Sequence, residues 1–258
     1  MKLIRSRDNP RFKLLRQLAT STRERRKAGL ALLDGLHLIA AYRASGGVPE
    51  QLILSESGAS DAQAAALARG IAGQALLVLA DALFNEVAQV ATPTGIVALI
   101  RTPQPGPLPD RIEHCVMLES IQDAGNLGSI LRSTAAAGVS TVLLSHGCAF
   151  AWSPKVLRAG MGAHFSLEIY DNVNLHASLG RLSGRLICAS SHAEKSIYQA
   201  DLRGPLAWAF GNEGAGLSAA LSAAAAEQLR IPMPGGAESL NVAAAAAICL
   251  FEQVRQRI

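Results

Sequence analysis

The chain has 258 residues, of which 50% are hydrophobic and 17% charged, with a formal net charge of +4. This length is sufficient for two domains with separate buried cores. No apolar stretch of about 18 residues runs without polar breaks, which excludes a transmembrane helix. The start of the chain lacks the apolar core of a signal peptide, so we expect a cytoplasmic protein. The four cysteines show no metal-binding spacing, and we expect reduced structural thiols and no metal site.

Basic residues are concentrated at the start of the chain. Residues 1–27 contain ten of the 24 Lys and Arg residues and two acidic residues, a local excess of +8. Such a block favours binding to a polyanion, because each phosphate that it neutralises releases counterions. The alternative is a solvated helix face that only keeps the protein soluble. The charge distribution favours nucleic acid over this alternative.

The first hundred residues alternate between helical patterns and short apolar runs. A proline-rich stretch follows, "RTPQPGPLPD", which cannot continue a helix or a sheet interior and is typical of a semi-rigid linker. We therefore place a first domain at 1–102, a linker at 103–111 and a second domain at 112–258. In the first domain we expect helices at about 11–27, 34–45, 60–72 and 81–89, and strands at 51–55, 75–80 and 95–100.

The alternation of strands and helices continues after the linker. It predicts two α/β domains with largely parallel sheets. Because ligands of open parallel sheets bind at the carboxyl ends of strands, polar residues that directly follow the apolar runs are candidate site residues. The apolar runs predict strands at 115–120, 140–145, 185–190, 206–211 and 228–233, with helices from about 126, at about 153–160 and at the C-terminus.

A polar turn follows the first strand of the second domain. In "IQDAGNLGSILRS" we expect Asp123, Asn126 and Gly128 to form the turn and Arg132 to lie on the helix after it. The amide of Asn126 both donates and accepts, which suits holding a hydroxyl or bracing a loop. Without its neighbours, Arg132 could equally be an ordinary exposed helix arginine.

A glycine-rich segment, "GNEGAGLS", follows a later strand. Gly211, Gly214 and Gly216 allow the backbone to approach a ligand closely, and Glu213 adds a carboxylate. That carboxylate has two possible roles, which are to cap a helix or to pair with Arg132. Glycine-rich turns after strands are common, so the segment is weak on its own.

The last segment, "PMPGGAESLNVAAAAA", leads from a Pro-Gly turn into an alanine-rich helix. We expect Ser239 to be the N-cap of this helix, whose free N–H groups can then face a ligand. A lone serine cap is usually structural, so this segment is not decisive alone either.

Taken in order and spacing, the three segments resemble the SpoU/TrmH family of RNA 2′-O-ribose methyltransferases, in the SPOUT class. The resemblance covers about 112–258 and includes the linking stretch "SPKVLRAGMGAHFSL". The N-terminal part is similar to the RNA substrate-binding domain often fused to these enzymes. The resemblance implies an α/β fold in which a trefoil-knotted C-terminal domain with a mostly parallel sheet follows a smaller α/β domain resembling a ribosomal protein.

The resemblance also implies ligands, an assembly and site residues. Ribosomal RNA is the expected substrate, with tRNA as the alternative, and a homodimer is expected through the C-terminal domain, whose terminal helix has more apolar surface than its own sheet requires. The implied cofactor is S-adenosyl-L-methionine, held largely through main-chain atoms of Gly211, Ile231, Met233 and Leu240. The implied catalytic set is Asn126, Arg132, Glu213, Ser239 and Asn241.

Two features qualify the roles within this set. Arg132 is sometimes cast as a general base in the family, but a guanidinium with a pKa above about 12 is rarely neutral. We therefore favour an electrostatic role for Arg132, toward a phosphate or a developing alkoxide, with a water, a phosphate oxygen or Ser239 relaying the proton. Ala243 departs from the family, which commonly has serine there, and this puts the positioning of Asn241 in question.

Two other functions are less consistent with the sequence. A nicotinamide-dependent oxidoreductase would use a glycine-rich turn, but "GNEGAG" is not GxGxxG and no acidic residue follows about 20 positions later in the required βαβ context. An RNA-binding module of this fold without catalytic activity would keep the basic block and lose the polar set. Because the whole polar set is present, the sequence favours the enzyme.

Overall fold

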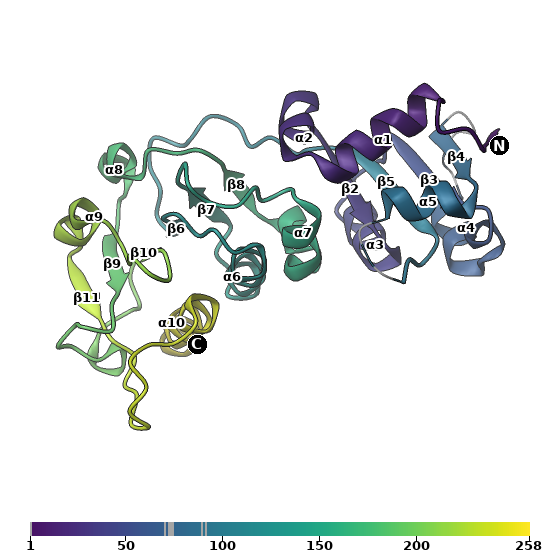
Figure 1. Ribbon diagram of the computed structural model, residues 1–258. Helices are drawn as coiled ribbons and strands as arrows, with labels where there is room; N and C mark the ends of the chain where they lie inside the picture. The colour runs from purple at the N-terminus through teal and green to yellow at the C-terminus, as the bar shows by residue number, and fades with distance from the viewer. Residues whose placement is uncertain (1, 70, 72–74, 89, 91) are drawn as a thin grey trace. The chain divides into compact units, whose positions relative to one another are not determined.

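The structure, a computed structural model, describes residues 2–69, 71, 75–88, 90 and 92–258 (Figure 1). The chain forms two compact units. The first comprises Met1–Pro103 with Trp152–Phe165, and the second comprises Gln104–Ala151 with Ser166–Ile258. Each unit has its own sheet and its own hydrophobic core. No helix among the described residues combines the length and apolar character needed to cross a membrane.

The first unit is built on a mixed sheet, not the largely parallel one predicted. Its elements are β1 (Lys2–Ile4), α1 (Pro10–Thr20), α2 (Thr22–Ala28), β2 (Leu30–Asp34), α3 (Leu36–Ala44), β3 (Gln51–Ser55), α4 (Ala62–Ala68), β4 (Leu76–Leu79), α5 (Asp81–Val87), β5 (Ile96–Arg101) and α7 (Pro154–Gly160). The strand order is β1-β4-β3-β5-β2. The three strands β1, β4 and β3 are parallel, whereas β5 is antiparallel to both β3 and β2. Neither β1 nor β2 was predicted.

The helix expected at 11–27 is divided into two at Ser21. The Ser21 N–H donates to the Gln17 carbonyl at 2.9 Å and ends α1, while its hydroxyl accepts from the Glu24 N–H at 3.2 Å and begins α2. One residue thus serves as the C-cap of one helix and the N-cap of the next. The helices expected at 60–72 and 81–89 correspond to α4 and α5, and these predictions extend to residues 70, 72 and 89, which lie outside the described residues.

Arg25 belongs to the basic block but does not face solvent. Its side chain is buried, and its guanidinium donates to the Leu18 carbonyl at 2.5 Å, the Ala19 carbonyl at 3.2 Å and the Thr22 hydroxyl at 2.8 Å. The two carbonyls lie in the last turn of α1, where a helix leaves acceptors without intrahelical partners. Burial lowers the pKa of Arg25. Arg25 therefore holds the corner between α1 and α2 together and is not available to a polyanion.

The second unit has an entirely parallel six-stranded sheet. Its elements are β6 (Cys115–Leu118), α6 (Ala124–Ala136), β7 (Thr141–Leu144), β8 (Glu168–Tyr170), α8 (Leu175–Ser178), β9 (Arg185–Ala189), β10 (Leu206–Phe210), α9 (Ala219–Ala224), β11 (Glu227–Leu229) and α10 (Val242–Arg257). The strand order is β11-β9-β10-β6-β7-β8. This sheet confirms the parallel α/β prediction and adds the three-residue β8, which was not predicted.

Helices cover both faces of the second sheet (Figure 1). On one face, Met117 and Ala209 belong to a core that includes Leu175 of α8 and Leu221 of α9. On the other face α10 packs beside α6, and the buried indole N–H of Trp208 donates to Gln253 of α10 at 2.9 Å. The buried indole and the buried amide satisfy each other, which fixes how α10 lies on the sheet.

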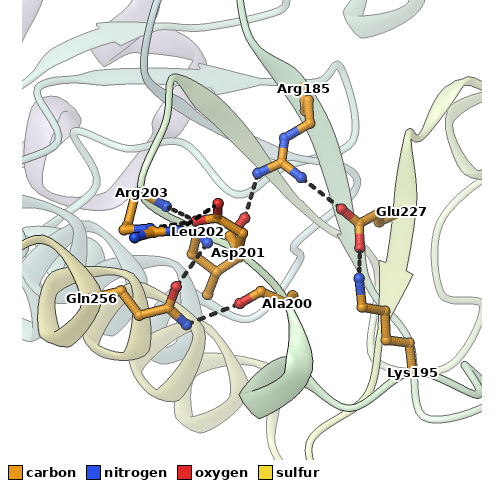
Figure 2. Close-up of polar contacts among 8 residues, drawn as sticks. All are labelled: Arg185, Lys195, Ala200, Asp201, Leu202, Arg203, Glu227 and Gln256. Carbon is orange, nitrogen blue, oxygen red and sulfur yellow. Dashed lines mark hydrogen bonds and ion pairs between the residues drawn. The ribbon is translucent and has the colours of Figure 1, made fainter.

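The connection between β9 and β10, residues 190–205, is fastened to the strands beside it (Figure 2). Arg185 of β9 donates to Glu227 of β11 at 2.6 Å and to the carbonyl of Asp201, and Lys195 bonds the same Glu227 carboxylate at 2.5 Å. Main-chain bonds between Arg230 and residues 195 and 197 add to these contacts. The connection and the segment that follows β11 are therefore held together.

The far end of the same connection is tied to the terminal helix (Figure 2). Gln256 of α10 accepts a hydrogen bond from the Leu202 N–H at 2.8 Å and donates to the Ala200 carbonyl at 3.1 Å. Asp201 between them binds the Arg203 guanidinium through both carboxylate oxygens, which lowers the pKa of Asp201 to about 2. Because main-chain groups of the connection are bonded to α10, the end of the chain contributes directly to its shape.

We predict that Arg25→Ala lowers the free energy of unfolding of the first unit by about 2 kcal/mol, because it removes charged donors from buried carbonyls. Arg23→Ala is the matched control on the same helix, since Arg23 is exposed, and it should change stability by less than about 0.5 kcal/mol. Urea unfolding followed by circular dichroism measures both. Equal stability of the two variants would contradict the structural role of Arg25.

Candidate active site

A cavity of about 560 Å³ lies at the carboxyl ends of β9, β10 and β11. Its walls come from the residues after each of these strands, as expected for a ligand site in an open parallel sheet. The volume falls within the range of small-molecule sites, roughly 300–1,000 Å³. Of the polar residues predicted as site residues, Glu213 and Ser239 line this cavity, whereas Asn126, Arg132 and Asn241 do not.

The loop after β10 forms one wall and is closed tightly on itself. A side chain at Gly211 would come within 2.2 Å of the Gly216 backbone, and Gly216 itself has a positive φ of 69°. The side-chain oxygen of Asn212 accepts hydrogen bonds from the N–H groups of Gly214 at 2.9 Å and Ala215 at 3.0 Å. The glycines are therefore required for the close approach of the two ends of the loop.

The same loop is anchored to the end of β6. The Asn212 amide donates to the Ser120 carbonyl at 3.0 Å, and Glu119 accepts from the Ser218 N–H at 2.7 Å. Ser120 has a φ of 56°, which is uncommon for a residue other than glycine, and its N–H donates to the Ser145 hydroxyl at 2.9 Å. None of these anchoring residues was predicted, although Asn212 lies within the glycine-rich segment and Glu119 and Ser120 end a predicted strand.

Three predicted residues form a continuous polar chain. The amide of Asn241 donates to the side-chain oxygen of Asn126 at 2.8 Å, and the Asn126 amide donates to Glu213 at 2.5 Å. These residues lie 115 and 87 positions apart in the sequence. Of the two roles considered for Glu213, the structure supports neither, because its partner is Asn126.

The expected turn before α6 is shorter than predicted. Asp123 accepts from the Asn126 N–H at 2.7 Å and is the N-cap. The helix therefore begins at Ala124, and Asn126 and Gly128 lie within its first turns instead of in the preceding turn. A capping aspartate satisfies an N–H that the helix start leaves free, which explains why the helix begins this early.

The N-cap of the terminal helix is Asn241, so the expectation for Ser239 was wrong. The side-chain oxygen of Asn241 accepts from the N–H groups of Ala243 at 2.9 Å and Ala244 at 3.3 Å. Asparagine caps helices as well as serine does, and the helix starts directly after it. Asn241 therefore uses its oxygen on the helix and its amide on Asn126. The Ala243 backbone takes part in this cap although its side chain has no hydroxyl.

The predicted site residues divide into three groups in the structure. Asn126 and Asn241 do not line the cavity but are connected to its wall through Glu213. Arg132 does not line the cavity either. It is exposed on α6, six residues or about 9 Å of helix beyond Asn126, and its side chain has no hydrogen bond or ion pair with another described residue. The predicted residues that line the cavity are Gly211, Glu213, Ile231, Met233, Ser239 and Leu240.

The end of β9 supplies part of the cavity that sequence reasoning missed. Ser190, Ser191 and His192 line it directly after the strand. These residues follow an apolar run that was correctly predicted as a strand, so the rule applied to the other strands would have found them. They were missed because no glycine signature marks this segment.

The charge of the cavity wall favours a cationic ligand. Glu213 and Glu238 contribute carboxylates, and none of the described residues that line the cavity is Lys or Arg. Cys188 also lines it, but burial raises the pKa of that thiol to about 11, so it is neutral near pH 7. The described residues contain no group of three or more His, Cys, Asp or Glu side chains that could hold a metal ion.

A sulfonium cofactor fits this arrangement. Two carboxylates with no opposing cation suit a positively charged sulfur centre, whereas the diphosphate of a nicotinamide dinucleotide would meet repulsion. The cavity also offers main-chain groups of the 211–217 loop and apolar side chains such as Leu240 and Ile231. The residues present therefore fit S-adenosyl-L-methionine better than a dinucleotide.

Comparison with known proteins agrees with these features. Residues 113–251 match the SpoU rRNA Methylase family, and residues 9–98 match the MRM3-like substrate binding domain. The chain is 32% identical over 253 residues to the 23S rRNA (guanosine(2553)-2′-O)-methyltransferase RlmP of Bacillus subtilis, covering 97% of this chain and 98% of that protein.

Solved structures extend the similarity to the fold. An AdoMet-bound rRNA methyltransferase from Sinorhizobium meliloti is 28% identical, with a TM-score of 0.85 over 100% of this chain and 98% of that one. The SpoU methyltransferase AviRb from Streptomyces viridochromogenes, in complex with the cofactor AdoMet, is 26% identical with a TM-score of 0.82, covering 96% and 99%. Together with the profile match and the near full-length relative, these similarities establish that the chain belongs to the SpoU rRNA methylase family.

Proposed function

We propose that this chain transfers a methyl group from S-adenosyl-L-methionine to a ribose 2′-hydroxyl of ribosomal RNA. The observation that carries the proposal is the acidic cavity at the carboxyl ends of β9, β10 and β11, with the Asn241–Asn126–Glu213 chain at its wall. The Bacillus subtilis relative, named for methylation of 23S rRNA, supports ribosomal RNA over tRNA as the substrate.

The cavity residues have separate tasks toward the cofactor, which when bound supplies an electrophilic methyl group on a positively charged sulfur. Gly211, Ile231, Met233 and Leu240, which all line the cavity, are proposed to hold the cofactor largely through main-chain atoms. Glu213 and Glu238 favour its positive charge. Because the Cys188 thiol stays protonated, the wall presents no thiolate that would compete for the methyl group.

Glu213 is proposed to hold the ribose hydroxyl. One of its oxygens accepts from Asn126, and the other has no partner among the described contacts. The side-chain amides of Asn126 and Asn241 both donate hydrogen bonds within the polar chain, which holds Glu213 in one orientation. The second carboxylate oxygen of Glu213 remains available as an acceptor. A carboxylate in this position accepts the hydroxyl hydrogen and directs the oxygen lone pair toward the methyl group. The proton that the hydroxyl loses is proposed to pass through the Ser239 hydroxyl to solvent water.

Arg132 is proposed to act on the RNA. It is exposed and has no ion pair with a described residue, so its charge is available to a phosphate. A guanidinium stays protonated at neutral pH and stabilises developing negative charge without taking a proton. Its position outside the cavity lining agrees with a role on the substrate and not on the cofactor.

The two parts of the chain are proposed to divide the work. A domain at 1–102 captures RNA, which the match of 9–98 to a substrate binding domain supports. After a linker at 103–111, a domain at 112–258 holds the cofactor. The trefoil knot of this second domain also remains a proposal. The bonds that fasten residues 190–205 to Arg230 and to Gln256 support it, because they close a loop beside the last segment of the chain.

Ribosomal RNA from cells that lack the gene should be missing one or more ribose methylations, which the wild-type gene restores. We expect Arg132→Ala to restore none while binding S-adenosyl-L-methionine with unchanged affinity, because the residue acts on the substrate. Ribose-methylation mapping and isothermal titration measure the two effects. Loss of cofactor affinity in Arg132→Ala would contradict the assignment, and an unchanged methylation map in the deleted strain would contradict ribosomal RNA as the substrate.

Asn212→Ala should weaken cofactor binding about tenfold, because the 211–217 loop loses three hydrogen bonds that fix its shape. Asn212→Asp is the matched variant, since it keeps the acceptor for the two loop N–H groups but places a carboxylate oxygen instead of a donor opposite the Ser120 carbonyl. Its affinity should lie between those of the wild type and Asn212→Ala. Titration calorimetry that found all three proteins equal would show that the loop does not depend on this brace.

We also propose a homodimer built through the second unit. Apolar side chains of this unit remain exposed, among them Phe251 on α10 and Leu240 before it. The family resemblance places such an interface beside the active site. An apolar face of this kind is typical of an isologous contact.

Light scattering should therefore give a dimer at micromolar concentration, and Phe251→Asp should shift it to monomer, because a carboxylate in an apolar interface lacks a partner. Ala223→Asp on α9, at an exposed position on the opposite face of the sheet, is the control and should remain dimeric. A monomeric wild-type protein would refute the dimer, and equal dissociation by both variants would refute this interface.

A further inference from the structure

A second cavity, of about 280 Å³, lies within the first unit, where β5 ends and where β2 and β3 begin. Along β5 and β3, the side chains of Val97 and Ile53 point into the core beneath α1. Because side chains alternate along a strand, Leu99, Arg101 and Gln51 stand on the same face. Leu99 is the last residue of β5 in the packed core, whereas Arg101 is exposed and Gln51 half-buried. With Leu30 of β2, which is paired with Arg101, these three residues line the cavity.

The cavity has an apolar floor and a polar rim. Leu30 and Leu99 form the floor with Leu14 of α1, whose side chain is 42% exposed. Arg11 and Arg101, both exposed, also line the cavity and give the rim its positive charge. An exposed leucine beside two arginines offers an apolar surface and positive charge within one small space. A single planar group with an attached anion has this combination of properties.

The structure limits which members of the basic block can meet an anion. Besides the buried Arg25, four of them are engaged in ion pairs within the first unit. Arg11 has no ion pair and no side-chain hydrogen bond to a described residue. The four pairs are Arg5–Glu56 at 2.7 Å, Arg7–Glu86 at 2.6 Å, Lys13–Asp8 at 3.0 Å and Arg16–Glu86 at 3.4 Å.

Arg101 is held in place and keeps free donors. Its Nε donates to Glu50 at 2.8 Å, while its two terminal nitrogens have no bond to a described residue. Glu50 also lines the cavity, where it orients the guanidinium instead of cancelling both cations. The rim therefore carries one oriented arginine, one unpaired arginine and the amide of Gln51.

We infer that this cavity holds one unpaired nucleotide of the substrate RNA. This inference rests on the proposed function. The base lies on the floor formed by Leu14, Leu30 and Leu99, where apolar and guanidinium surfaces suit the face of any base. Gln51 reaches a base edge, and Arg11 and Arg101 bind the phosphate. The small volume excludes a duplex or a folded segment of a protein partner. The match of residues 9–98 to a substrate binding domain supports RNA as the occupant.

The probe is a fluorescein-labelled single-stranded RNA decamer, titrated into the full-length protein at several salt concentrations. Leu14→Ser should weaken binding about tenfold and leave the salt dependence unchanged, because an apolar contact releases no counterions. Arg11→Ala should weaken binding and also make the slope of log affinity against log salt shallower by about 0.7, the value for one phosphate contact on a single strand. The same sequence as a duplex should bind Leu14→Ser and wild type equally.

Arg7→Ala is the matched control, since Arg7 is an exposed arginine of the same block that is paired with Glu86. It should bind within about twofold of wild type with an unchanged slope. Equal effects of Arg7→Ala and Arg11→Ala would overturn the inference and indicate that RNA is attracted by diffuse charge. Unchanged binding by Leu14→Ser would show that no base lies on the apolar floor.

Methyl transfer to ribosomal RNA by the wild type separates the two proposals. If the wild type methylates and the variants bind the decamer as it does, only the nucleotide site is wrong. If the wild type neither methylates nor binds RNA, both proposals are wrong.

Discussion

The candidate site depends on the hydrogen bonds that Asn212 makes within and beyond its own loop. One side chain joins two N–H groups of the 211–217 loop to the carbonyl of Ser120 at the end of β6. The adjacent strands β10 and β6 thereby present their polar ends in a fixed relation. Glu213 follows Asn212 directly, so the hydrogen bonds of Asn212 also position the carboxylate that accepts the hydrogen bond from the Asn126 amide. A loop that is ordered before its ligand arrives avoids the entropy cost of ordering on binding.

The parallel second unit was predictable because its strands are short apolar runs with helical patterns between them. The polar ends of such strands meet at one edge, so residues as distant as Asn126 and Asn241 could be expected together. The first sheet was less predictable. The antiparallel course of β5 depends on its pairing with β2 and β3, and no local pattern encodes that direction. The strand β2 is separated from α2 and from α3 by a single glycine on each side, so its apolar run adjoins helical patterns directly.

The residue roles that sequence reasoning missed depend on local backbone geometry that residue type alone does not encode. Ser239 and Asn241 are both good capping residues, and only the geometry of the first turn decides that Asn241 accepts from Ala243 and Ala244. In the sequence, Arg25 cannot be distinguished from the exposed cations of the basic block. In the structure it is buried because the ends of α1 and α2 meet around it. Composition gives the sum of charges but not which of them are already neutralised.

The protein binds a cationic cofactor and a polyanionic RNA. The acidic groups that favour the cofactor repel RNA phosphates, and the basic groups that favour RNA repel the cofactor. The acidic cavity belongs to the second unit, and the arginine-rimmed cavity belongs to the first. Salt screens exposed charges beyond about 8–10 Å, so the charged residues that line each cavity dominate the field that its ligand meets. Ion pairs such as Arg7–Glu86 restrict the positive field further, to the few cations left unpaired. Arg132 is the proposed exception to this division: it is exposed on α6 of the second unit and has no ion pair with a described residue, which leaves its charge for a substrate phosphate.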